Sequence, residues 1–210
     1  MKLDTLLLFT AASFVLAVTP GPTMLLALSN GITGGMRRAR WGIAGAIVGS
    51  STVIALVALG LGSLLAASEW LFNALRFAGV VYLVWIGLRL WRSPVADVEA
   101  MLARPHTAPQ GPQALLRSLT VALSNPKSVL FFAAFLPQFI DTGAPQAMQY
   151  LVLGAIFIGL DTFIMLAYAG AGTQAVRWLS HRGLQRMNRG CAAGMWALAA
   201  TLAFWRRPGA

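Results

Sequence analysis

The chain has 210 residues, of which 58% are hydrophobic and only 10% are charged. Soluble domains carry about 25% charged residues, and a soluble fold of this size could not hide so much apolar surface from water. The net charge is +10, but the basic residues form short clusters between apolar runs, which is typical of membrane topology rather than of nucleic-acid binding. The composition therefore predicts a membrane protein with no nucleic-acid partner.

Apolar runs of about 20 residues predict transmembrane helices. Six such runs occur, at 6–28, 43–66, 72–90, 115–140, 150–172 and 191–204. The first resembles a signal peptide because Lys2 precedes an apolar core, but Asp4 and the five later runs favour a membrane helix. The predicted fold class is an all-α polytopic membrane protein made of one transmembrane domain.

The proline-rich segment 93–113 is the only long linker, and it divides the domain into repeat one (1–92) and repeat two (114–210). An offset of 105 residues places Ala17 on Ala122. Because each half holds an odd number of helices, the halves would have opposite orientations in the membrane. The sequence thus predicts two inverted three-helix repeats, a common transporter architecture.

Basic residues predict the orientation, because cytoplasmic loops are enriched in Lys and Arg. They cluster after the first, third and fifth runs, within 37–40, 89–104 and 177–189. We therefore expect a multi-pass protein of the bacterial inner membrane with both termini in the periplasm, although Arg206 and Arg207 at the C-terminus oppose this orientation.

Two of the predicted helices are interrupted, one by Pro20-Gly21-Pro22 and the other by Asn125-Pro126-Lys127. A proline removes a backbone N–H and displaces the carbonyl one turn earlier. In hydrocarbon the freed groups are costly unless they are buried in protein or face water. We expect the two breaks to face each other across one cavity, where helix N-termini suit a carboxylate and freed carbonyls suit an ammonium. The alternative is a pair of ordinary proline kinks.

Lys127 and Asp161 are charged residues near the middle of predicted spans. Each costs about 2.5–3.5 kcal/mol at the centre of a membrane helix. A structural ion pair would explain both, but such pairs seldom add much stability. In the functional interpretation, Lys127 binds a substrate carboxylate or neutralises Asp161, and Asp161 holds an ammonium or accepts a proton. Tyr168, two turns after Asp161, would line the same face or only pack there.

Small and polar residues predict two packing features. Gly42, Gly45 and Gly49 form a stripe for close helix packing, inside the monomer or in a homodimer. Asn30 is expected to cap the first span through a left-handed turn.

Few residues suit enzyme or metal chemistry. Cys191 is the only cysteine, and His106 and His181 lie in polar linkers. We therefore expect no enzyme activity, no cofactor and no metal site. The alternatives that stay open are a transporter of another small solute or cation on the same scaffold, and a membrane assembly subunit.

Several of these motifs, taken in order, resemble the lysine-exporter type (LysE/RhtB-like) family of amino-acid efflux proteins. They are Thr19-Pro-Gly-Pro22, Ser29-Asn-Gly31, Asn125-Pro-Lys127 and Phe135-Leu-Pro-Gln-Phe139, followed by Asp161 and Tyr168. The resemblance implies a six-helix inner-membrane exporter of amino acids or close derivatives, driven by proton entry. It also implies a substrate or ion pathway lined by Pro20, Gly21, Pro22, Asn125, Pro126, Lys127 and Asp161. One midspan carboxylate beside one midspan lysine favours a neutral amino acid as substrate.

Overall fold

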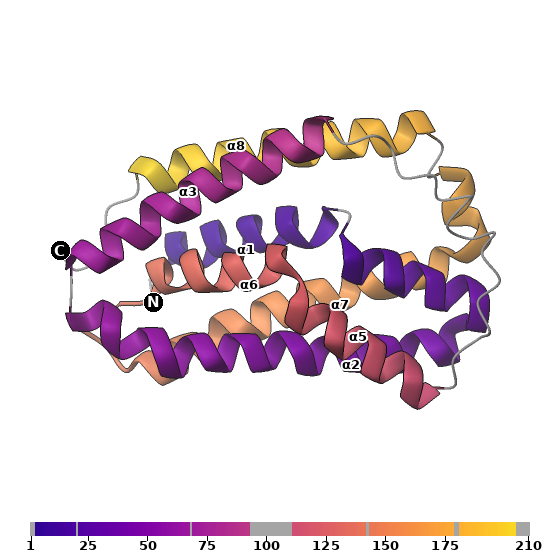
Figure 1. Cartoon of the computed structure of the whole chain (residues 1–210), viewed down its shortest axis with the longest axis horizontal. Coiled ribbons are helices and arrows are strands. Elements are labelled where there is room, and N and C mark those ends of the chain that lie inside the picture. Colours follow the sequence, from indigo (N-terminus) through magenta and orange to yellow (C-terminus); the bar gives the residue numbers. More distant parts are fainter. Residues whose placement is uncertain are drawn as a thin grey trace.

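The computed structural model describes residues 3–19, 21–67, 69–92, 111–141, 143–178 and 181–204, and over these residues the chain is helical without strands (Figure 1). The elements, in chain order, are α1 (Leu3–Val18), α2 (Pro22–Ala67), α3 (Glu69–Arg92), α5 (Gly111–Ser124), α6 (Pro126–Ala134), the short 3₁₀ helix η1 (Leu136–Phe139), α7 (Gln146–Trp178) and α8 (His181–Phe204). The all-α class predicted from the sequence is confirmed for these residues. Most of the predicted linker lies outside them, and its last three residues belong to α5.

The helix α2 is bent at Gly35, which divides its 46 residues into two parts. Gly35 has φ 62° and ψ −172°, a backbone conformation that glycine adopts most readily. Across the bend, Arg38 Nη1 donates a hydrogen bond of 2.8 Å to Thr33 Oγ1. The first predicted span therefore consists of α1 and the part of α2 before Gly35, and the second span is the part after it.

The prediction that Asn30 caps the first span is wrong. Asn30 lies within helical backbone, and among the described residues only Gly35 has a positive φ. Its side chain is 1% exposed, and its Nδ2 has no hydrogen-bond partner in the described part of the chain. Gly42 leaves the space for this amide, because a Cβ on Gly42 would lie 2.4 Å from Asn30 Nδ2. Asn30 is thus a packed interior residue.

The fourth predicted span is also broken, since α5 and the following helical segment meet at a bend of 54°. By length and composition alone, the described residues hold two helices that can cross a membrane, or three if this bent pair counts as one. The two long ones are Pro22–Gly60 and Gln146–Ala171. Large apolar side chains stand on the outer surface, such as Leu59 (81% exposed) and Trp70 (78%). This exposure suits a lipid environment.

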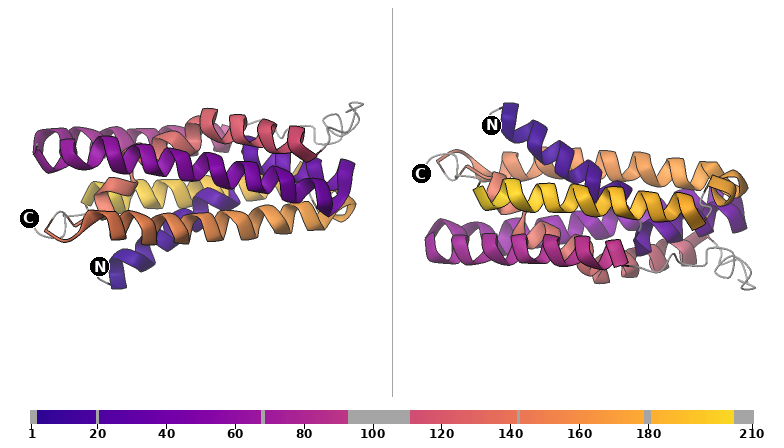
Figure 2. Two further views of the ribbon diagram at one scale, coloured as in Figure 1. Left: turned by 90° about the horizontal axis from the view of Figure 1, so that it is seen from below. Right: turned by 90° about the horizontal axis from the view of Figure 1, so that it is seen from above.

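The helices form one elongated bundle in which the chain reverses direction between its two halves (Figures 1 and 2). The chain runs along α1 toward one end of the bundle, and along α5 and α6 in the opposite sense. The start of α1 and the end of α8 lie at the same end, while the bend of α2 and the start of α5 lie at the other (Figure 1). α3 and α8 pack side by side.

The stripe of glycines on α2 packs against α5. A Cβ on Gly45 would lie 2.1 Å from the carbonyl oxygen of Leu115, and one on Gly49 would lie 2.6 Å from Ala122 Cβ. Only glycine therefore permits this approach of the two helices. The close packing predicted from the stripe is confirmed, and it occurs inside the monomer.

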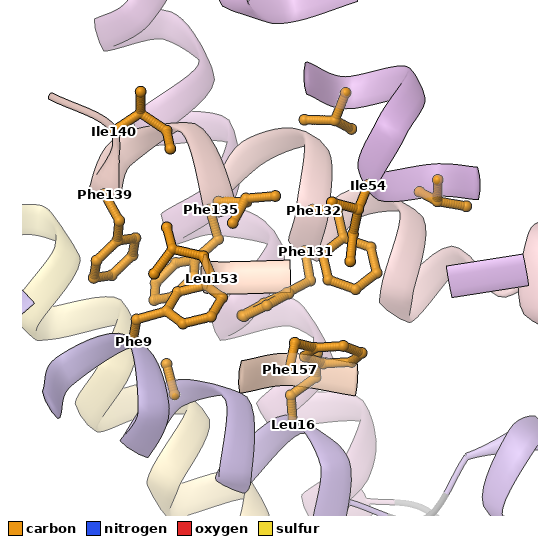
Figure 3. Close-up of a cluster of buried hydrophobic side chains, with 14 of the residues drawn as sticks. Phe9, Leu16, Ile54, Phe131, Phe132, Phe135, Phe139, Ile140, Leu153 and Phe157 are labelled. Atoms are coloured by element: carbon orange, nitrogen blue, oxygen red, sulfur yellow. The ribbon is translucent and has the colours of Figure 1, made fainter. Parts of the chain in front are cut away.

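An aromatic cluster forms the core between α1, α6, η1 and α7 (Figure 3). Phe9 packs edge-on to Phe139 with ring centroids 5.3 Å apart, and Phe132 packs edge-on to Phe157 at 4.7 Å. Such pairs contribute about 0.5–1.5 kcal/mol beyond their buried area. The cluster joins α1 to α6, because the ring centroids of Phe9 and Phe131 lie 6.4 Å apart. It therefore helps to position the break that follows α1 and the break that precedes α6.

Candidate functional site

The two interrupted helices meet at Lys127. This residue lies in the first turn of α6, and its Nζ donates hydrogen bonds of 2.9 Å to the carbonyl oxygens of both Leu16 and Thr19 at the end of α1. Gly21, on the other side of the first break, also lies near the ammonium, because a Cβ added there would lie 3.2 Å from Lys127 Nζ. A cation from the second half of the chain therefore lies inside the break of the first half.

The carbonyl groups that bind Lys127 are free because of the local sequence. In a helix the carbonyl of residue 16 accepts from the N–H of residue 20, but Pro20 has no N–H to donate. The last carbonyls of a helix also carry a partial negative charge. Lys127 thus satisfies the Leu16 carbonyl, which the proline leaves unpaired, and the Thr19 carbonyl just past the end of α1, at the pole of the helix that attracts a cation.

The break before α6 is completed by its own side chains. Asn125 is the N-cap: its Oδ1 accepts from the backbone N–H of Lys127 at 3.1 Å, and its Nδ2 donates to Ser128 Oγ at 3.2 Å. Pro126 occupies the start of the helix, where a missing N–H costs nothing. Asn-Pro-Lys therefore starts a helix in a defined position and directs its lysine toward α1.

The start of α2 lacks such a cap. Gly21 has no side chain that could accept from the first N–H groups, and its carbonyl accepts the first helical hydrogen bond, from Leu25 N at 3.0 Å. Pro22 is the first residue of α2 and is exposed. The predicted pathway residue Pro20 lies outside the described residues. The structure therefore brings Gly21 close to Lys127, and a pathway role of Pro22 stays a prediction.

Asp161 provides the negative charge near Lys127. It lies on α7, is 8% exposed, and interacts with the ammonium through its electrostatic field. No direct salt bridge joins the two residues, because the ammonium is held by the carbonyls of α1. The Asp161 carboxylate also forms no hydrogen bond with any residue that the structure describes. A simple Lys127–Asp161 ion pair thus does not account for these two charges.

Cys191 belongs to the same cluster but was not predicted. This residue of α8 is 8% exposed, its thiol interacts with the side chain of Thr19, and it lies within electrostatic range of Lys127. The half-buried Tyr168 on α7 lies within electrostatic range of the same thiol. A lone cysteine carries no spacing pattern, so the only signal was its position within a run of small residues, Gly190 to Gly194.

The cluster therefore combines one cation, one unpaired carboxylate, freed carbonyls and an uncapped helix start. Among the described residues, no group of three or more His, Cys, Asp or Glu side chains could hold a metal ion. A zwitterion, which carries one positive and one negative group, matches this set of partners better than a divalent cation does.

Helices with apolar outer surfaces and buried charges are typical of a membrane protein with a functional site in its interior. The family model described as LysE type translocator matches residues 14–205, and the chain belongs to this family. The resemblance stated from the motifs is thereby confirmed.

Proteins of known name are similar over most of their length. A homoserine/homoserine lactone efflux protein of Salmonella typhi is 36% identical over 171 residues, covering 81% of this chain and 82% of that protein. A leucine efflux protein of Klebsiella pneumoniae subsp. pneumoniae is 32% identical, covering 79% and 77%. An uncharacterized membrane protein of Vibrio cholerae is 32% identical, covering 90% and 91%. No solved structure matches the chain.

Proposed function

We propose that this protein exports neutral amino acids or close derivatives from the bacterial cytoplasm. The observation that carries the proposal is the Lys127 ammonium within the break of α1, beside a buried Asp161 that has no direct partner. The names of the relatives support it, since homoserine and leucine are neutral amino acids.

The site offers a partner for each end of a zwitterion. The carboxylate of the amino acid would lie near Lys127 and the uncapped start of α2, where positive charge is concentrated. The ammonium would lie near Asp161 and the carbonyls of Leu16 and Thr19. A basic amino acid would need a second acid for its side chain, and Asp161 is the only acidic residue within the predicted spans.

The proposed scaffold has six spans arranged as two inverted repeats, 1–92 and 114–210, joined by the linker 93–113. Two observations support this arrangement: both halves begin with an interrupted helix, and these two helices run in opposite directions (Figure 1). The scaffold would lie in the inner membrane with both termini in the periplasm, because the bend of α2 carries Arg37, Arg38 and Arg40. A homodimer stays a prediction.

Protons are the coupling ion in this proposal. A buried carboxylate that pairs with a cation in one state and loses it in another changes its affinity for protons during the cycle. Asp161 is the only buried carboxylate in the site cluster, so it is the residue that would carry the proton.

A transport assay tests the function. Cells that overproduce the protein are loaded with dipeptides of leucine, homoserine or lysine, and release of the free amino acid is measured with and without a protonophore. We expect faster release of the neutral amino acids, abolished by the protonophore, with Thr120→Ala as a control because Thr120 is exposed and bonds only to Leu116 O. Release that equals that of cells lacking the protein, for every amino acid, would refute the proposal.

Labelling tests the orientation. In a Cys191→Ser background, single cysteines replace the exposed residues Gly143, in the turn before α7, and Arg37, just after the bend of α2. The start of α7 and the bend of α2 lie at opposite ends of the bundle (Figure 1). A membrane-impermeant maleimide is expected to label the first in intact cells and the second only after permeabilisation. The reverse pattern would place both termini in the cytoplasm.

A further inference from the structure

The Lys127 ammonium lies where the proposed function places the ammonium of the substrate. Its two acceptors, the carbonyls of Leu16 and Thr19, are the groups that would bind the ammonium of an amino acid. Each hydrogen bond is 2.9 Å long, so two of the three N–H groups are bonded and the nitrogen occupies the position between the two oxygens, where a second ammonium cannot lie at the same time. In this structure the cationic subsite is filled by the protein itself.

We infer that Lys127 is an internal substitute for the substrate ammonium, which fills the subsite when the site is empty and which an amino acid must displace in order to bind. This inference rests on the proposed function and names the regulation of the same site. After displacement, the lysine side chain is free to pair with the carboxylate of the incoming amino acid.

The length and position of the side chain make this exchange feasible. Lys127 starts from a helix that is fixed by the Asn125 cap, while its flexible stem reaches across to α1. Only the far end of the stem has to move, because the backbone of α6 keeps its own hydrogen bonds to Asn125. The carbonyls of α1 would thus be satisfied in both the empty and the loaded state.

Such an exchange would prevent an empty carrier from exposing unpaired buried groups. Unsatisfied backbone carbonyls in a membrane interior are costly, so a carrier that lacked the lysine would cross between its two states slowly when empty. The alternative is that Lys127 is a permanent cap of α1 with no part in substrate exchange. The two explanations differ in one respect: only the first makes an amino acid and an amine compete for the same carbonyls.

The experiment uses Lys127→Ala and n-propylammonium, which replaces the atoms that the substitution removes. Purified protein is heated in detergent with n-propylammonium chloride, or with tetramethylammonium chloride at the same concentration as a cation without N–H donors. We expect n-propylammonium to raise the unfolding temperature of the variant but not that of the parent protein, whose subsite is occupied. Tetramethylammonium should raise neither.

The decisive step adds leucine or homoserine, whichever the parent protein exports. We expect a saturating amino acid to raise at least tenfold the n-propylammonium concentration that gives half of the stabilisation in Lys127→Ala. An unchanged concentration means that Lys127 only caps α1 and overturns the inference, as does the lack of any effect of n-propylammonium. Neither result affects the export assay with the parent protein, so failure of the inference and failure of the proposed function remain distinguishable.

Gly21→Ala provides a second test that keeps the lysine and does not depend on folding of Lys127→Ala. The added Cβ would lie 3.2 Å from Lys127 Nζ and 3.4 Å from Cε, so it crowds the ammonium in its subsite. An amino-acid ammonium in the same subsite would meet the same Cβ, so only the crowding of the lysine stem at Cε and Cδ distinguishes the two occupants. If the lysine must leave before the amino acid binds, relief of these stem contacts should tighten amino-acid binding about twofold. Gly60→Ala, which meets nothing within 4 Å, is the matched control. Weaker or unchanged binding in Gly21→Ala would overturn the inference.

Discussion

The two helix breaks differ in how their backbone groups find hydrogen-bond partners. The break before α6 is closed locally, because Asn125 caps the helix and bonds to Ser128. The break between α1 and α2 has no local cap, and its free carbonyls are satisfied by Lys127 from the other half. One break is thus self-sufficient and provides a cation, while the other is open and depends on it.

This difference suggests that one break positions the site and the other binds the ligand. A break that is held by its own side chains keeps its geometry whether or not a ligand is present. A break whose acceptors are satisfied by a distant side chain can exchange that partner for another cation at little cost. The asymmetry therefore makes the end of α1 the variable part of the site and the start of α6 the fixed part.

The largest expected effect comes from removing the buried anion that interacts with Lys127. Asp161→Asn should reduce export to the level of cells lacking the protein, because the amide cannot attract the ammonium or carry a proton. The measurement is release of the exported amino acid, with membrane insertion checked by immunoblotting. Asp161→Glu keeps the charge and should retain part of the activity. Full export by Asp161→Asn would show that the site works without this charge.

The next largest effect is expected from the close packing of α2 against α5. Gly45→Ala should lower the free energy of unfolding by about 1–3 kcal/mol, the usual cost of overpacking, because its Cβ would lie 2.1 Å from the backbone oxygen of Leu115. Gly60→Ala in the same helix meets nothing within 4 Å and should be neutral or stabilising. Unfolding temperatures in detergent compare the two, and equal temperatures would contradict the packing described here.

Part of the fold could be predicted because burial in lipid dictates the composition of each span. Apolar runs located the helices, and the prolines located both breaks. The bend could not be placed, because Asn30 and Gly35 both tolerate left-handed backbone and the sequence does not show which one adopts it. The start of α8 at His181 was missed because its first two turns are polar.

The sequence predicted the charged residues of the candidate site but not their hydrogen-bond partners. Lys127 and Asp161 stand out because charge is expensive within a span. The actual partners of Lys127 are backbone carbonyls. Every residue has a carbonyl, so the sequence could indicate a charged cavity or a Lys127–Asp161 ion pair but not these two acceptors. Cys191 joins the cluster only through the packing of α8, which hydrophobic periodicity does not specify.

A smaller effect is expected from the self-sufficient break. Asn125→Ala removes the side-chain cap of α6 and should cost about 1 kcal/mol of stability, the typical value for an N-cap. Export should fall as well, since the start of α6 positions Lys127. Asn125→Ser keeps an uncharged acceptor for the Lys127 N–H and should recover part of the stability. If Asn125→Ala were as stable as the parent protein, the break before α6 would not depend on this cap.

The smallest effect is expected from removing the second hydrogen bond of the cap, which joins Asn125 to Ser128. Ser128→Ala removes the hydroxyl that accepts from Asn125 Nδ2 at 3.2 Å but leaves the Asn125 bond to the Lys127 backbone intact. We expect a loss of about 0.5 kcal/mol, within the net range of a single hydrogen bond, and export close to that of the parent protein. Ser124→Ala is the control from the other side of the break, because the Ser124 hydroxyl is exposed and bonds within α5. A loss as large as that of Asn125→Ala would mean that Ser128 holds the asparagine in place, so that the self-sufficient break depends on the pair rather than on the cap alone.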